Sequence, residues 1–167
     1  MKIIQRRAFL SFVLLMIFVG DVVAQDHEEK AVIKMTKADF LEKVWNYEKD
    51  NTKWHFLGDK PAIIDFYADW CGPCRKAAPI LEEVAQIYKG RVDIYKVDTQ
   101  VEKVLSGNLG IRGLPTFLYI PVDGEPAMSQ GVGRTTDDIK KGFVRMIEEL
   151  LLRNEPKETR DTTKSSN

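Results

Sequence analysis

Apolar residues along this chain fall either in short continuous runs or at helical spacing, and the two patterns alternate. Continuous runs suit strands covered on both faces, whereas apolar residues three and four apart suit a helix with one buried face. The runs predict strands at 31–35, 62–68, 92–97 and 116–120, then a turn over 121–126 and an antiparallel return over 127–132. The spacing predicts helices at 36–47, 75–88, 101–105 and 136–151. This order implies an α/β fold with helices on both faces of a mixed sheet of four to five strands.

Individual residues mark where the predicted helices begin and end. Thr36 suits the N-cap of the first helix, because its hydroxyl can accept a hydrogen bond from an unpaired backbone N–H. Pro79 is expected to kink the second helix and Gly90 to end it. The polar segment 50–60 is predicted to be a loop. Its bulky residues are expected to pack over a sheet end rather than to recognise a partner; they are Trp54, His55 and Phe56.

The first 24 residues have the pattern of a secretory signal peptide. A basic start precedes an apolar run over 8–20, and small residues end the stretch, so cleavage is expected after Ala24. The run is shorter than the about 20 residues that span a membrane comfortably, and an uncleaved anchor is the alternative. Residues 25–30 are predicted to be flexible and 154–167 to be a disordered tail. The expected location is therefore periplasmic or secreted.

The length and the charge balance of the chain narrow its expected partners. It has 167 residues, which suits a single domain, here predicted over 31–153. Basic and acidic residues number 25 each, and no stripe of Lys and Arg is present, so nucleic acid is not an expected partner. No dimerisation segment is visible, and a monomer is expected.

The two cysteines of the chain, Cys71 and Cys74, enclose Gly72 and Pro73. This spacing lets both sulfurs meet at a helix start, where unpaired N–H groups and the helix dipole favour an anion. Thiolate is the attacking species, so Cys71, expected to be exposed, attacks a substrate disulfide. Cys74, one turn further and expected to be buried, then displaces the substrate. Pro73 stiffens the loop, and its missing N–H costs nothing in a first turn.

Two other interpretations of the cysteine pair are open at this point. One is half of a zinc site, which needs about four ligands, but His27 and His55 are not at ligand spacing from the pair. The other is a structural disulfide, which constrains the unfolded chain very little when its loop is so short. The pattern favours a redox-active disulfide that uses neither a metal nor another cofactor.

The segment from Tyr67 to Arg75, which contains both cysteines, closely resembles thioredoxin. The resemblance extends over about 31–153 and rests on several separate motifs in family order. They are Ala62-Ile63-Ile64-Asp65-Phe66, Pro79, Lys96-Val97-Asp98, Ile111-Arg112-Gly113-Leu114-Pro115-Thr116-Phe117 and Val132-Gly133. The resemblance implies a thioredoxin fold and protein disulfides as substrates. The loop 50–60 departs from it, being longer than in a minimal member of the family.

The resemblance assigns a catalytic role to two charged residues of the predicted sheet. Asp65 matches the buried aspartate that handles the proton of the second cysteine. Its apolar strand fits that role, because desolvation raises the pKa of a carboxyl toward useful base strength. A hydrogen-bonded structural aspartate is the alternative. Lys96 matches the lysine near that aspartate, and an ordinary solvated lysine is its alternative.

The resemblance also implies a substrate-docking surface. Pro115 matches the cis-proline that faces the active site, where its missing N–H leaves neighbouring backbone free to pair with an extended segment. Trp70 matches the tryptophan that flanks the site, and core packing is the alternative for it. The expected substrate-binding residues are Trp70, Gly72, Pro73, Gly113, Leu114, Pro115 and Gly133.

The leading functional hypothesis is a protein-disulfide reductase that acts outside the cytoplasm. Gly-Pro between the cysteines resembles the strongly reducing members of the family, and Leu114 is apolar as in those members. A membrane thiol-electron donor would recharge the pair, and the substrates would be misoxidised proteins or apocytochrome cysteines. A disulfide donor or isomerase is the second hypothesis. A binding or holdase module with incidental cysteines is the third.

Overall fold

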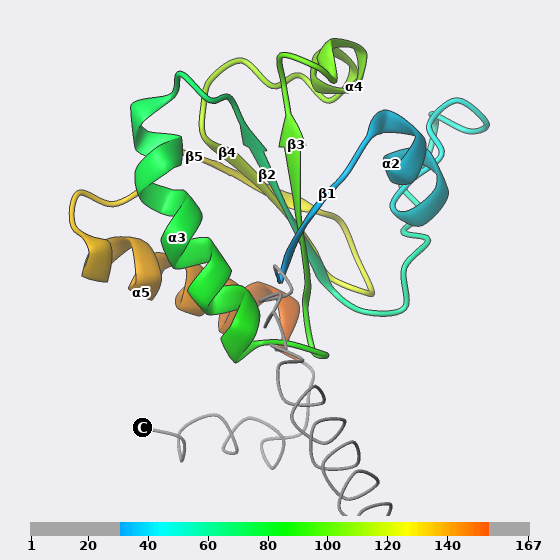
Figure 1. The fold of residues 1–167 in the computed structure, drawn as a ribbon. Coiled ribbons are helices and arrows are strands. Elements are labelled where there is room, and N and C mark those ends of the chain that lie inside the picture. Colours follow the sequence, from blue (N-terminus) through cyan, green and yellow to red (C-terminus); the bar gives the residue numbers. More distant parts are fainter. Residues whose placement is uncertain (1–30, 154–167) are drawn as a thin grey trace, which may run out of the picture.

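The computed structural model describes residues 31–153; the predicted signal peptide, flexible N-terminus and C-terminal tail lie outside the described residues (Figure 1). The elements follow in the order β1 (Val32–Lys34), α2 (Lys37–Lys43), β2 (Ala62–Tyr67), α3 (Gly72–Ile87), β3 (Asp93–Asp98), α4 (Lys103–Asn108), β4 (Thr116–Ile120), β5 (Ala127–Gln130), α5 (Thr136–Met146) and η2 (Ile147–Leu151). This is the predicted order of strands and helices, with η2 as a π-helical continuation of α5. Within the described range, no helix is long and apolar enough to cross a membrane.

The strands form one mixed sheet in the order β1-β3-β2-β4-β5. β1 and β2 run parallel to β3, whereas β4 runs antiparallel to β2 and to β5. The predicted mixed sheet is therefore confirmed. The interior position of β2 explains its apolar run, because a strand between two neighbours with helices on both faces has no solvated side.

Helices cover both faces of this sheet (Figure 1). α3 and α5 cover one face, where Ile63 and Phe143 belong to one apolar cluster. α2 and α4 cover the other face, where Phe40 and Leu105 belong to a second cluster. Side chains alternate between the faces along a strand, so Asp65, two residues after Ile63, points to the face that α3 covers.

Helix α2 begins where the sequence predicts it. The Thr36 hydroxyl accepts a hydrogen bond from the backbone N–H of Asp39 at 3.2 Å, and the Asp39 carboxylate accepts one from the backbone N–H of Thr36 at 3.0 Å. This reciprocal pair satisfies two N–H groups that have no partner within the helix. Thr135 and Asp138 make the same pair of bonds at the start of α5.

Some helix boundaries differ from the predicted ones. α3 already begins at Gly72 and continues through Pro79 to Ile87, so it ends before Gly90, which has a φ of 82° in the following turn. α4 begins two residues later than predicted. The N–H groups of Val101 and Glu102 both donate to the carbonyl of Asp98, and this turn delays the start of the helix.

The loop 50–60 contains no helix or strand, and it covers part of the second apolar cluster. Trp54 and Phe56 pack against this cluster, and the Trp54 ring centroid lies 5.2 Å from that of Trp45. The packing role predicted for these two residues is confirmed. His55 is exposed and does not share it.

Candidate active site

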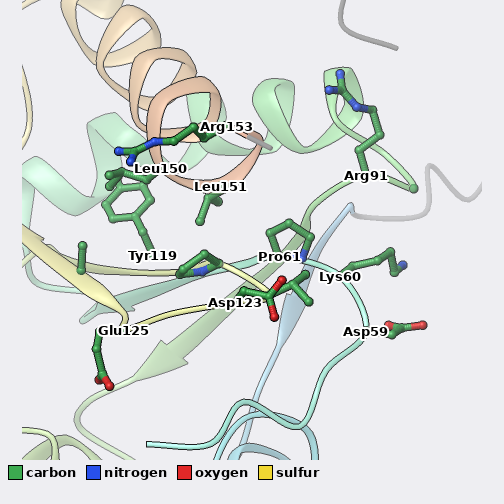
Figure 2. Close-up of a pocket in the computed structure, with 14 residues that line it drawn as sticks. Asp59, Lys60, Pro61, Arg91, Tyr119, Asp123, Glu125, Leu150, Leu151 and Arg153 are labelled. Carbon is green, nitrogen blue, oxygen red and sulfur yellow. The ribbon is translucent and has the colours of Figure 1, made fainter. Parts of the chain in front are cut away.

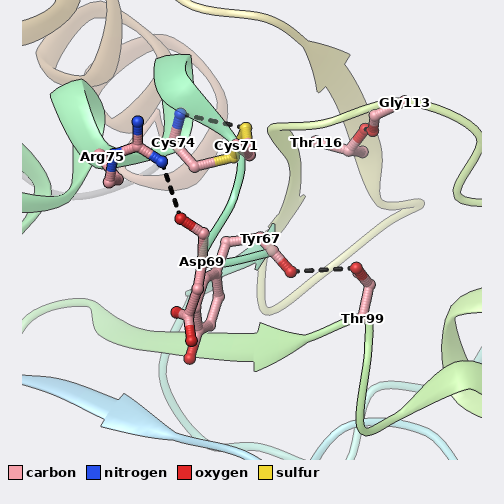
Figure 3. Close-up of a disulfide and its surroundings, with 8 residues drawn as sticks. All are labelled: Tyr67, Asp69, Cys71, Cys74, Arg75, Thr99, Gly113 and Thr116. Atoms are coloured by element: carbon pink, nitrogen blue, oxygen red, sulfur yellow. Dashed lines mark hydrogen bonds between the residues drawn. A yellow bond between two sulfur atoms is a disulfide. The ribbon is translucent and has the colours of Figure 1, made fainter.

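The two cysteines lie where strand β2 passes into helix α3 (Figure 3). Cys71 is the N-cap of α3, and Cys74 lies in its first turn. A disulfide joins the two residues, whose Cα atoms are 5.3 Å apart. Gly72 and Pro73 fill the first two helical positions, so the missing N–H of Pro73 removes no hydrogen bond from the helix.

The start of α3 supplies a hydrogen-bond donor to sulfur. The backbone N–H of Cys74 donates to Sγ of Cys71 at 3.2 Å, as Figure 3 shows. N–H groups in the first turn have no partner within the helix, and the helix dipole adds a positive potential there. On reduction, this donor and this dipole favour thiolate on Cys71, the form of cysteine that attacks disulfides.

Both cysteines are buried in the disulfide form, with exposed fractions of 4% for Cys71 and 3% for Cys74. The burial predicted for Cys74 is confirmed, but the exposure predicted for Cys71 is wrong for this form. The bond joins Sγ of Cys71 to Sγ of Cys74, which lies in the first turn of the helix. Trp70, the preceding residue, is 66% exposed.

Asp65 lies in β2 on the face that α3 covers and is only 3% exposed. Burial raises its pKa to about 7, and the positive charge of Lys96 opposes part of this rise. Lys96 is the register partner of Asp65 on β3. Among the described residues, Oδ1 of Asp65 has no hydrogen-bond partner. A buried carboxyl with a pKa near neutrality is suited to accept and release a proton.

The turn before β4 lies near the cysteines (Figure 3). Its Leu114–Pro115 peptide bond is cis, which confirms the predicted isomer. The Thr116 hydroxyl donates to the carbonyl of Gly113 at 2.7 Å and so closes this turn. A Cβ at Gly113 would meet only the terminal amide of Gln130, the far end of a flexible side chain that can move away, so space alone does not require glycine at this position.

A shallow pocket of about 370 Å³ lies beside the exposed Trp70 and reaches helix α4. Gly113 and Leu114 also line it, so it brings together three residues of the predicted docking surface. Its other lining residues were not predicted to be functional; they are Thr99, Lys103, Ser106, Gly107, Ile111 and Arg112. Ile111 and Arg112 belong to the thioredoxin-like motif over residues 111–117, so the sequence did offer a reason to place them near the site. The residues of α4 belong to no such motif, and only the folded structure brings them next to Trp70.

Gly133 lies apart from this pocket. It lines another hollow, of about 290 Å³, between β5 and α5. A Cβ at Gly133 would lie 2.5 Å from the Cβ of Asp138, so its packing against the first turn of α5 requires glycine. Its contact with a substrate stays a prediction.

A third pocket, of about 540 Å³, lies at the opposite end of β2 from the cysteines (Figure 2). Basic and acidic side chains line it in equal number: Lys60, Arg91 and Arg153 with Asp59, Asp123 and Glu125. It therefore favours neither sign of charge in a ligand. No group of three or more potential metal-ligating side chains occurs within residues 31–153.

A Cys-Gly-Pro-Cys disulfide at the start of a helix, set against a mixed sheet with helices on both faces, defines a class of thiol–disulfide oxidoreductases. The thioredoxin family model matches residues 31–145, and the chain belongs to the thioredoxin family. The chain is therefore a protein-disulfide oxidoreductase whose redox group is the Cys71–Cys74 pair. Members of this family need no cofactor.

Two curated thioredoxins and one solved thioredoxin structure are similar to this chain. The thioredoxin of Borreliella burgdorferi is 50% identical over 99 residues, which are 59% of this chain and 84% of that protein. Thioredoxin 1 of Nostoc sp. is 43% identical over 60 residues, 36% of this chain and 56% of that protein. Among solved structures, chloroplastic thioredoxin z superposes with a TM-score of 0.54 at 32% identity, over 71% of this chain and 95% of that one.

Proposed function

We propose that this chain reduces protein disulfides outside the cytoplasm and that Cys71 is the attacking cysteine. The observation that carries the proposal is the place of Cys71 at the N-cap of α3, with the N–H of Cys74 directed at its sulfur. This arrangement favours thiolate on Cys71 once the pair is reduced. The residues between the cysteines, Gly72 and Pro73, resemble those of strongly reducing members of the family and support the reducing direction.

The reaction begins with the Cys71 thiolate, which attacks one sulfur of a substrate disulfide. A bond forms between Cys71 and that sulfur, and the other substrate sulfur leaves as a thiolate that takes a proton from water. Cys74 then loses its proton to Asp65 and attacks Sγ of Cys71. The Cys71–Cys74 disulfide forms, and the second substrate sulfur leaves as a thiolate. The substrate gains two electrons, which the cysteine pair loses, and Asp65 passes its proton on to water.

Lys96 has a positioning role in this scheme. It is the register partner of Asp65, and its charge lowers the pKa of the carboxyl from the value that burial alone would impose. The substrate docks beside the cysteines, against Trp70 and the segment from Gly113 to Pro115. The cis-Pro115 has no N–H, so the backbone next to it is available to an extended substrate segment.

The proposed location depends on the sequence of the first 24 residues, which has the pattern of a signal peptide. In an oxidising compartment the cysteine pair needs a source of electrons. A membrane thiol-electron donor supplies them in this proposal, and the enzyme acts as a monomer. Misoxidised proteins and apocytochrome cysteines are the proposed substrates, because both carry disulfides that must be reduced in such a compartment.

A trapping experiment tests both the reaction and its location. Cys74→Ser removes the resolving sulfur, so we expect the variant to accumulate mixed disulfides at Cys71 when it is expressed in the source cell. The cells are fractionated and the conjugates are found by non-reducing electrophoresis and mass spectrometry. The double variant Cys71→Ser/Cys74→Ser is the matched control and should trap nothing.

The outcomes of this experiment separate the two parts of the proposal. Conjugates in the extracytoplasmic fraction support both parts. Conjugates confined to the cytoplasm contradict the location and leave the reaction standing. The absence of conjugates that depend on Cys71 contradicts the reaction itself.

A further inference from the structure

The pocket beside Trp70 combines apolar surface with a net positive charge. Trp70, Ile111 and Leu114 supply apolar surface, whereas Lys103 and Arg112 supply two positive charges. No acidic residue lines the pocket. The whole chain has equal numbers of acidic and basic residues, so this local excess of positive charge comes from the fold and not from a basic composition.

The two cations of this pocket are available to a ligand. Lys103 and Arg112 are both exposed, and no ion pair among the described residues involves either of them. Asp69 and Glu102 precede lining residues in the sequence, but neither of them lines the pocket.

The two hydroxyl groups of the pocket are already engaged. The Thr99 hydroxyl donates to the carbonyl of Tyr67 at 3.0 Å, and the Ser106 hydroxyl donates to the carbonyl of Glu102 at 2.9 Å. Both hydroxyl protons are thus committed to the backbone. The charged groups of Lys103 and Arg112 and the indole N–H of Trp70 are therefore the side-chain donors of this pocket that remain for an occupant, and only the two cations attract a carboxylate by their charge.

The position of the pocket links it to the reacting disulfide. Trp70 directly precedes Cys71, and Leu114 directly precedes the cis-Pro115. Helix α4, which begins at Lys103, lies at the end of the sheet where α3 begins (Figure 1). A volume of about 370 Å³ is near the lower end of the roughly 300–1,000 Å³ of ligand pockets, which suits a few side chains of a docked segment.

We propose that this pocket selects substrates whose reactive cysteine is followed or preceded by an acidic residue. The substrate's apolar atoms contact Trp70, Ile111 and Leu114, and its carboxylate lies near Lys103 and Arg112. The mixture of apolar surface and charge favours a peptide segment over a free inorganic anion. This inference rests on the proposed function, because the selected segment is the one that carries the disulfide.

The charge on the substrate affects the rate of encounter and the stability of the docked complex. Exposed ion pairs are individually weak, and salt screens them. Two cations acting on one substrate charge are expected to make an acidic peptide react about tenfold faster than a basic one at low ionic strength. The preference should fall to about threefold or less near 0.5 M salt, where the screening length is only a few ångströms.

The test uses three synthetic disulfide peptides that differ only in the residue next to the reactive cysteine, which is Glu, Gln or Lys. The second-order rate constant for their reduction by the pre-reduced full chain is measured by stopped flow. Lys103→Gln and Arg112→Gln are each expected to lower the Glu-over-Lys preference about threefold, and the double variant should abolish it. Lys89→Gln is the matched control, because this exposed lysine lies beyond the far end of α3.

The peptide with Gln separates this inference from the proposed function. Reduction of the Gln peptide without any preference between Glu and Lys contradicts the selection and leaves the reductase standing. A preference that survives in the double variant also contradicts it, because the charge must then act elsewhere. Failure to reduce the Gln peptide contradicts the proposed function and this inference with it.

Discussion

At the scale of single residues, the burial of Asp65 favours proton transfer at the active site but destabilises the folded protein when the carboxyl is ionised. Burial on the α3 side of the sheet raises its pKa to about 7, which suits proton exchange with a neighbouring thiol. The same burial makes the ionised form costly, because that carboxylate loses its hydration and Oδ1 has no hydrogen-bond partner in the described part of the chain. Removal of the charge should therefore stabilise the fold and impair proton handling.

The pH dependence of stability follows from this raised pKa. An unfolded aspartate titrates near about 3.9, so between that pH and about 7 the folded protein binds more protons than the unfolded chain. The stabilisation is fully present at low pH and is lost as the pH rises through this window. Between about pH 5 and pH 8.5, we expect the titration of Asp65 to lower the free energy of unfolding of wild type by roughly 2–3 kcal/mol. Asp65→Asn has no titrating group at this position, so this contribution should be absent from its pH dependence.

Denaturant unfolding of the oxidised protein at several pH values measures this difference. Asp123→Asn is the control, since Asp123 is exposed and should leave the pH dependence as it is in wild type. Equal pH dependence in wild type and Asp65→Asn would show that the buried carboxyl does not titrate near neutrality.

At the scale of elements, the loop 50–60 is the described segment that the sequence predicts to be longer than in a minimal thioredoxin. The Trp54 ring packs in a tilted arrangement against the Trp45 ring, with the centroids 5.2 Å apart, and with Phe56 it packs against the apolar cluster beneath α2. The loop therefore adds packing to the face of the sheet opposite α3.

The substitution Trp54→Ala separates packing from partner recognition. We expect it to lower the free energy of unfolding by roughly 2–3 kcal/mol, somewhat less than the loss of a fully buried ring. The rate of insulin disulfide reduction should stay as in wild type, because the loop lies away from the cysteines. His55→Ala, at an exposed neighbour, should change neither quantity. A loss of reductase rate without a loss of stability would point to partner recognition instead.

The existence and order of the elements could be predicted because apolar spacing follows directly from which face is buried. β4 has the predicted bounds, and Thr36 forms the predicted cap. The late start of α4 depends on a hydrogen-bonded turn at Asp98, and the π-helical end of α5 keeps apolar residues at nearly helical spacing, so neither is visible in the pattern.

The sequence indicated the reacting residues of the candidate site but not how all of its residues are placed. Cys71, Cys74 and Asp65 stand out from their residue types and neighbours. The burial of Cys71 was missed, because the exposure of a residue depends on how the folded chain packs around it, which the spacing of the cysteines does not specify. The place of Lys103 beside Trp70 was missed as well, because these residues are far apart in the sequence and only the folded sheet brings them to one pocket.

For the whole molecule, the direction of electron flow is set by the reduction potential of the cysteine pair. The Gly-Pro dipeptide leads us to expect a potential near the about −270 mV of reducing thioredoxins. Equilibration with glutathione or dithiothreitol buffers, followed by quantification of the free thiols, measures it. A potential near about −120 mV would make the chain a disulfide donor, the alternative direction for the same site.

The proposed order of attack depends on Cys71 being ionised and accessible in the reduced protein. The most direct measurement is the pH dependence of its alkylation by iodoacetamide, with the modified residue identified by mass spectrometry. The N-cap position and the Cys74 N–H predict that Cys71 reacts first, with an apparent pKa well below the about 8.5 of free cysteine. A Cys71 that resists alkylation, or that titrates like free cysteine, would contradict the proposed mechanism.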